Sequence, residues 1–181
     1  MPAGRRATVR DLYRTPGKAE LVDGALVLMP FTSGLHGYAV TAIAASLNDY
    51  RRRTKRGYAF ADNVGFLVRL PHRRSFSPDA AFHVGPIDAK FIEGAPVFAV
   101  EVRSEEDYGP KAERVMAGKR ADYFAAGTLV VWDVDVLRAQ CVRAFRAGDP
   151  QNPAVYRRGE TAGAEPAVPG WTLSVDELFI D

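Results

Sequence analysis

The sequence contains a single cysteine, Cys141, among its 181 residues. A lone cysteine cannot form an intramolecular disulfide, and this usage fits the reducing cytoplasm better than a disulfide-stabilised secreted module. No apolar run approaches the ~18 residues that a membrane-spanning helix needs. Residues 1–10 lack the apolar core of a secretory signal. We therefore expect a cytoplasmic protein without a membrane segment.

A strong charge imbalance is also absent. The chain has 24 Lys and Arg residues against 22 Asp and Glu residues, which leaves a net charge of +2. Such a mildly basic chain neither requires nor excludes nucleic acid as a partner. Hydrophobic residues make up 47% of the sequence and charged residues 25%, the mix of an ordinary globular protein. With no internal repeat and no low-complexity linker, residues 1–181 favour one domain, and 1–7 are expected to form a flexible terminus.

The N-terminal third of the chain predicts a hairpin followed by a long helix. Asp23-Gly24 separates two short apolar runs, 19–22 and 25–29, and this dipeptide is a strong hairpin signal because the tight turn needs positive φ. Apolar residues then recur at three- and four-residue steps over 33–56, which predicts an amphipathic helix. Its basic end, 51–56, is either a solvated helix end or a patch that follows a phosphate backbone.

The rest of the chain alternates apolar strands with one more long helix. Strands are expected at 58–60, 65–70, 80–84, 97–102, 129–134, 137–146 and 154–156, the first two joined to each other, and helices at 111–126 and after Ser174. Connections without strands are expected at 71–77, 86–96, 148–152 and 161–169. An N-terminal hairpin, helices beside buried strands and a β-rich C-terminal tail predict an α/β fold with a mixed β-sheet flanked by helices.

Three ionisable side chains occupy positions where burial is expected. Asp79 begins one predicted strand, and Glu101 ends the apolar run of another. Lys119 shares the apolar sector of its helix with Val115 and Tyr123. Burying an unpaired charge is costly, so ionised groups lie inside a protein only when they are paired or hold a metal. Three such placements within one stretch indicate a site.

Each of these side chains also has an ordinary structural interpretation. Asp79 could cap a turn. Glu101 could form an ion pair with Arg103 on the same strand face, and Lys119 could extend along its stem to solvent. Taken together, however, two carboxylates and a lysine suit one chemistry. Magnesium takes one or two carboxylates and keeps several waters, and a lysine can orient such a water or stabilise developing charge.

Several short motifs, in this order, resemble those of one known family. They are Glu20-Leu-Val-Asp-Gly24, His36, Ser77-Pro-Asp79, Val100-Glu-Val102 with Ser104, and Lys119-Arg-Ala-Asp-Tyr123 with Val131-Trp132. Over about residues 12–145 the chain resembles the Uma family, a bacterial group of restriction-endonuclease-like proteins within the PD-(D/E)XK nuclease superfamily. The resemblance implies a restriction-endonuclease-like fold, dependence on Mg²⁺ with Mn²⁺ as an alternative ion, and phosphodiester cleavage.

The resemblance also implies roles for individual residues. Asp79 and Glu101 would be metal ligands, and Lys119 would be the catalytic lysine, supplied from the helix. Glu20 matches the hairpin glutamate of the family and is expected as a third carboxylate at the metal, or else as an ordinary strand charge. His36 is expected to contact a phosphate or tune a carboxylate, or else to bond to the backbone.

The chain departs from the superfamily pattern at one informative position. The lysine usually stands two residues after the glutamate, where this chain has Arg103. Arginine stays protonated and cannot act as a base, so Arg103 is expected to bind a phosphate or to serve as an ion-pair partner. The hairpin also has Ala25 where relatives commonly carry an acid.

These observations lead to one preferred function and two alternatives. The preferred function is a Mg²⁺-dependent endonuclease acting on DNA, as a homodimer whose two sites cut the two strands. The first alternative is a catalytically inactive nucleic-acid-binding module on the same fold. The second is an interaction protein in which Asp79, Glu101 and Lys119 form a buried salt-bridge network.

Overall fold

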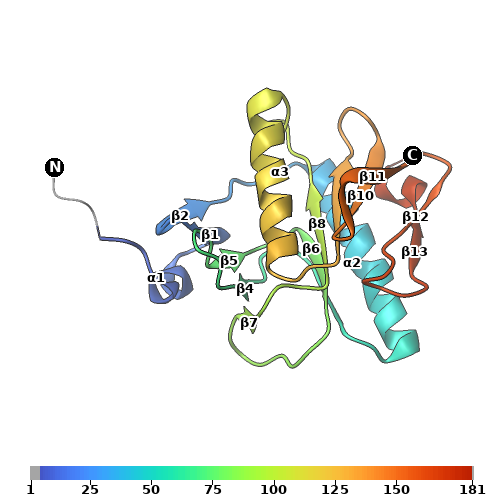
Figure 1. The fold of residues 1–181 in the computed structure, drawn as a ribbon. Coiled ribbons are helices and arrows are strands. Elements are labelled where there is room, and N and C mark those ends of the chain that lie inside the picture. Colours follow the sequence, from blue (N-terminus) through green and yellow to red (C-terminus); the bar gives the residue numbers. More distant parts are fainter. Residues whose placement is uncertain (1–4, 181) are drawn as a thin grey trace.

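The computed structural model describes residues 5–180 and forms a mixed α/β structure (Figure 1). Its elements are α1 (Val9–Arg14), β1 (Ala19–Val22), β2 (Ala25–Leu28), α2 (Gly34–Thr54), β3 (Tyr58–Phe60), β4 (Phe66–Leu67), β5 (Ser75–Phe76), β6 (Ala80–His83), β7 (Ile92–Glu93), β8 (Phe98–Val102), α3 (Pro110–Ala125), β9 (Val130–Asp135), β10 (Cys141–Arg146), β11 (Asp149–Arg157), β12 (Thr161–Gly163), β13 (Thr172–Ser174) and the 3₁₀ helix η1 (Val175–Leu178). No helix within residues 5–180 combines the length and apolar character needed to cross a bilayer.

The central element is a six-stranded sheet in the order β11-β10-β9-β8-β6-β3. Strands β8 and β9 run parallel, and the other neighbouring pairs in this sheet are antiparallel. Parallel neighbours need a crossover connection, which α3 provides between β8 and β9. The predicted α/β fold, with a mixed sheet flanked by helices, is therefore confirmed.

Successive side chains of the central strands point to opposite faces of the sheet, and each face is covered by its own hydrophobic core. On one face, Phe98 and Trp132 pack with Ile43 of α2. On the other face, Ala99 packs with Tyr123 of α3. Residues two apart on a strand share a face, so the alternation directs Glu101, which follows Ala99 by two, to the α3 side of the sheet.

The N-terminal segment is attached by specific contacts. The Thr8 hydroxyl and the Asp11 side chain form a capping box at the start of α1. The backbone N–H of Ala7 donates to the Gly24 carbonyl at 2.7 Å, and Arg5 pairs with Asp11 at 2.7 Å. The flexible terminus predicted for 1–7 lies partly outside the described residues, which begin at Arg5, and the single domain over 1–181 stays a prediction.

The predicted hairpin, both long helices and the central strands are confirmed, whereas the predicted connections were wrong. Strands β5, β7, β12 and the beginning of β11 lie within them. Strands β4, β5 and β7 form a separate small sheet in the order β5-β4-β7, so β3 and β4 are not partners as predicted. Two-residue strands carry no readable periodicity. Strand β11 contains Pro150 and Pro153, and it tolerates them because it is an edge strand.

Candidate active site

Asp79 is held at the edge of the central sheet where β6 begins and β8 ends. Its backbone N–H donates to the Val100 carbonyl at 3.0 Å. Its side-chain Oδ2 accepts the backbone N–H of Val102 at 2.8 Å. Since β6 and β8 are antiparallel, these two bonds fix the carboxylate of Asp79 beside the strand end that carries Glu101.

The carboxylate of Asp79 is buried and has two cationic or protonatable neighbours. Its Oδ1 accepts from Nζ of Lys18 at 2.6 Å, and its Oδ2 lies 3.2 Å from Nε2 of His36. Burial alone would raise the pKa of Asp79, but the hydrogen bond with His36 and the charge of Lys18 outweigh burial and lower it. Asp79 is therefore ionised at neutral pH. Of the roles expected for His36, contact with a carboxylate is the one present.

Glu101 lies on the α3 side of β8, with both carboxylate oxygens bonded to that helix. Nζ of Lys119 donates to Oε2 at 2.9 Å, and the Tyr123 hydroxyl donates to Oε1 at 2.6 Å. Burial raises the pKa of Glu101 above its ordinary value, Lys119 opposes that shift, and the charges of Asp79 and Glu20 add to it. Three acidic side chains therefore share one electrostatic environment.

Lys119 extends from α3 between two carboxylates. Its Nζ lies 2.9 Å from Oε2 of Glu101 and 2.9 Å from Oε1 of Glu20. Burial lowers the pKa of Lys119, but the two carboxylates more than reverse this effect and raise it, so the amine is protonated. The inward position predicted for Lys119 and Tyr123 is confirmed. The prediction for Val115 was wrong, since it is 64% exposed.

The polar sheet surface under the N-terminal half of α3 explains the exposure of Val115. Nε and Nη2 of Arg103 each donate at 2.7 Å to the two oxygens of Asp133, and Glu113 of α3 also accepts from Arg103. Apolar side chains at this end of the helix have no core to enter. Of the two roles expected for Arg103, ion pairing is the one present, with Asp133 and Glu113 as partners.

Glu20 reaches the site because the β1–β2 hairpin packs against β5. The backbone N–H of Leu21 donates to Oγ of Ser75 at 2.8 Å. Oε1 of Glu20 then accepts from the Ser77 N–H at 2.9 Å, and Oε2 accepts from Arg73. Burial raises the pKa of Glu20, but Lys119 and Arg73 outweigh it and lower the pKa. Glu20 is 2% exposed and its oxygens are engaged, so its expected role as a metal ligand stays a prediction.

Comparisons with known proteins identify the family of the chain and a similar fold. Residues 7–176 match the model of the Uma2 family, described as "Putative restriction endonuclease". The chain belongs to this family. Its structure is similar to a crystal structure from Anabaena variabilis ATCC 29413, described as a putative nuclease belonging to DUF820, with a TM-score of 0.75 and 19% sequence identity over 95% of this chain and 97% of that chain. At that identity the likeness shows a common fold. No curated protein matches the chain.

Sequence reasoning missed two cations that complete the site of this Uma2-family chain. Lys18 bridges Asp79 and Asp62, each at 2.6 Å. Arg73 links Glu20 to Asp122 of α3, with 2.8 Å between Nε and Oδ2 of Asp122. Lys18 had only a weak signal, because it lies in the bend just before β1 and strand alternation does not extend to it. Arg73 had none, because it lies in an irregular segment.

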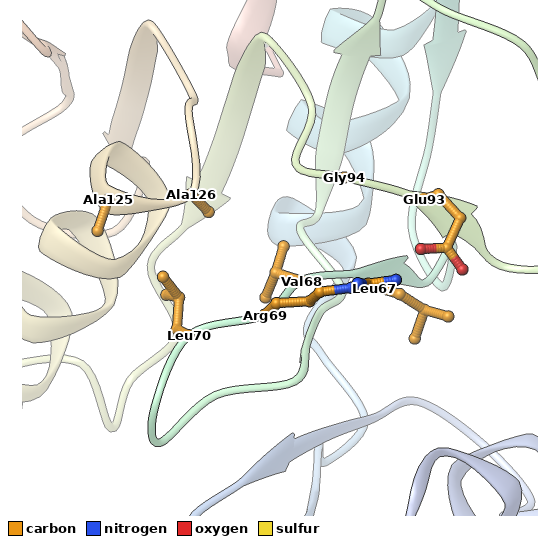
Figure 2. Close-up of a pocket in the computed structure, with 8 residues that line it drawn as sticks. All are labelled: Leu67, Val68, Arg69, Leu70, Glu93, Gly94, Ala125 and Ala126. Atoms are coloured by element: carbon orange, nitrogen blue, oxygen red, sulfur yellow. The ribbon is translucent and has the colours of Figure 1, made fainter.

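The structure also has a cavity of about 310 Å³, whose lining residues are drawn in Figure 2. It is bordered by 67–70, by Glu93 at the end of β7 and the following Gly94, and by Ala125 and Ala126 at the end of α3. None of the lining residues belongs to the cluster around Asp79 and Glu101, so in this Uma2-family chain the cavity and the ionisable cluster are separate features.

Proposed function

We propose that the protein is a divalent-metal-dependent endonuclease that hydrolyses phosphodiester bonds in DNA. The proposal rests on one observation. Asp79, just before β6, is hydrogen-bonded to the end of β8 that carries Glu101, and the protonated amine of Lys119 is bonded to Glu101 at 2.9 Å. Membership of the Uma2 family, whose model matches residues 7–176, adds independent support for nuclease chemistry.

The donor set suits Mg²⁺ or Mn²⁺. Among residues 5–180, no group of three or more His, Cys, Asp or Glu side chains is arranged to hold a metal ion. Magnesium needs only one or two protein carboxylates, however, because it keeps several of its waters. The charge of Asp79 helps to raise the pKa of Glu101, and a cation between the two would relieve this repulsion. Asp79 and Glu101 would hold the ion.

The bound ion would neutralise charge on the scissile phosphate and lower the pKa of a coordinated water. The protein's own side chains would position the reacting groups and stabilise the charge that develops on them. Protonated Lys119 can donate to a phosphate oxygen or to the attacking water, and so stabilise negative charge that develops there. Glu20 fixes this amine from its other side at 2.9 Å. His36 and the Val102 N–H orient Asp79.

A structural salt-bridge cluster is the competing interpretation, because Lys18 and Lys119 already neutralise the two carboxylates. Solvent contact favours the enzyme: the side chain of Glu101 is 21% exposed and that of Lys119 is 18% exposed. A cluster closed to water would admit neither a metal ion nor a phosphate. Here the two groups expected to meet substrate both retain access to solvent.

The test is cleavage of supercoiled plasmid with Mg²⁺ or Mn²⁺, measured for the wild type, Asp79→Asn, Glu101→Gln and the matched control Glu93→Gln. We expect cleavage that requires the ion, persists in the Glu93 variant and is lost in the other two. Metal-independent DNA binding without cleavage would favour the inactive binding module instead. If the protein neither cleaves nor binds DNA, the result would favour the interaction protein.

We also propose that two copies act together on the two strands. Light scattering behind a sizing column measures the mass of the protein, and the plasmid assay measures the ratio of linear to nicked product. A dimer that makes linear product without accumulating nicked circles is expected. A monomer that only nicks would contradict the homodimer and leave the chemistry of the site intact.

A further inference from the structure

Lys18 is the charged group beside Asp79 for which the proposed chemistry has no use. Its Nζ lies 2.6 Å from Oδ1 of Asp79 and 2.6 Å from Oδ1 of Asp62. The Lys18 side chain is only 15% exposed, whereas that of Asp62 is 44% exposed. The ammonium therefore sits between a buried acid that belongs to the site and an acid on the surface that does not.

Of the two carboxylate oxygens of Asp79, Oδ1 has fewer partners, and its partner is Lys18. Oδ2 of Asp79 already accepts from the Val102 N–H at 2.8 Å and lies 3.2 Å from His36. A carboxylate offers about four lone-pair sites, two on each oxygen. The oxygen left for a cation is thus Oδ1, where the ammonium of Lys18 is bonded.

An ion and this ammonium would conflict at such a short range. Magnesium binds carboxylate oxygens at about 2.1 Å, so it would share Oδ1 with a positive charge 2.6 Å from the same atom. Like charges this close repel, and the repulsion is stronger where water is excluded. The ammonium of Lys18 can stay paired with Asp62 when it leaves Asp79, because Asp62 already binds it and lies at the surface.

We propose that Lys18 competes with the divalent ion for Asp79, and that entry of the ion transfers its ammonium wholly to Asp62. Lys18 stabilises the ion-free site by neutralising Asp79, and it raises the ion concentration that the site requires. Asp62 acts only through Lys18, as the acceptor that remains once Asp79 is taken by the ion. This inference rests on the proposed metal role of Asp79 and Glu101.

The experiment measures Mn²⁺ binding without nucleic acid, from the electron paramagnetic resonance signal of free Mn²⁺. Lys18→Gln should bind Mn²⁺ about tenfold more tightly than the wild type, because a charge-assisted bond to the carboxylate no longer has to be broken. Lys18→Arg keeps the charge and should restore the wild-type affinity. Lys90→Gln, a lysine on an exposed loop, is the matched control and should not change it.

Asp62→Asn separates this exchange from a general electrostatic effect. In the wild-type background it should weaken Mn²⁺ binding, because Lys18 loses its second acceptor. In the Lys18→Gln background it should have no effect, since Asp62 then has no ammonium to receive. An equal weakening in both backgrounds would mean that Asp62 acts through its field alone, and would overturn the exchange.

The outcomes also separate this inference from the proposed function. Mn²⁺ binding that depends on Glu101 but is unchanged by Lys18→Gln would overturn the competition and leave the metal site standing. No Mn²⁺ binding by either the wild type or Lys18→Gln would overturn both. Binding by Lys18→Gln that exceeds binding by the wild type, with thermal denaturation showing both to be folded, would support both.

Discussion

The hydroxyl of Tyr123 donates a 2.6 Å hydrogen bond to Oε1 of Glu101, one helical turn beyond the lysine that binds Oε2. A single face of α3 thus engages both oxygens of the strand carboxylate through Lys119 and Tyr123. The helix that crosses between the two parallel strands is also the element that positions the candidate site.

Tyr123→Phe should shift the pH dependence of cleavage. The Tyr123 hydroxyl bond lowers the pKa of Glu101 against the opposing effect of burial. Loss of this bond raises the pKa of Glu101 further. As pH falls, a reaction that needs ionised Glu101 should therefore begin to lose activity at a higher pH in the variant than in the wild type. The acid limb of the rate profile measures the effect. An acid limb that does not move would mean that Glu101 is not the group being titrated.

Glu20→Gln should destabilise the protein strongly. Glu20 is fully enclosed and neutralises Arg73 and Lys119, and removing one member of a buried ion pair costs about 3–5 kcal/mol. Urea unfolding measures the change, with the exposed Glu105→Gln as the matched control. A loss below about 1 kcal/mol, as for an exposed pair, would show that the cluster does not hold the hairpin against the sheet.

Asp79 and Glu101 should influence stability in opposite directions. The folded-state pKa of Asp79 is lowered, so its stabilisation is present above the unfolded pKa and is lost as pH falls through the folded one. The pKa of Glu101 is raised, so its ionisation destabilises the folded protein as pH rises above the unfolded pKa. At pH 7, Asp79→Asn should cost about 2 kcal/mol, whereas Glu101→Gln should leave stability unchanged or increased.

Urea unfolding of these two variants at pH 7 checks the contrast, and repeating it between pH 4 and pH 8 follows the titration of Glu101, because Asp79 loses its stabilisation only at lower pH. Equal losses of stability at pH 7 would contradict it. A stable but inactive Glu101→Gln protein would show that Glu101 is retained for function at a cost in stability, as is common for residues of active sites.

Arg103→Lys should distinguish an ion-pair partner from a phosphate clamp. Arg103 makes a two-pronged contact with Asp133 at 2.7 Å on each side, and lysine cannot reproduce that geometry. We expect a loss of roughly 1–3 kcal/mol in the free energy of unfolding, with DNA affinity unchanged. Arg114→Lys, at an exposed position of α3, is the control. Weaker DNA binding at full stability would instead assign Arg103 to the substrate.

The strands and helices that carry the candidate site were predictable because their signals are local. Glu101 ends a run of apolar residues, and Lys119 falls on the same helical sector as Tyr123. The hairpin at Asp23-Gly24 shows positive φ at both residues, as its turn requires. Each of these features depends on residues within one turn or one strand, so the sequence alone contains the necessary signal.

The parts that escaped prediction depend on contacts between distant segments. Arg73 enters the site because β1 packs on β5, which brings it to Glu20, 53 positions away. Lys18 reaches Asp79 across 61 positions. The predicted burial of Val115 was wrong because Arg103 and Asp133 make the sheet polar beneath that part of α3. Strand pairing determines this polarity, and the helix sequence does not reveal it.

The central claim is that Asp79 and Glu101 hold one divalent ion, and anomalous scattering from crystals soaked in Mn²⁺ tests it most directly. The account predicts a single anomalous peak within about 2.1 Å of an oxygen of each carboxylate, with the Lys18 ammonium moved to Asp62. A peak elsewhere, or no peak while both lysines stay on their carboxylates, would contradict the account.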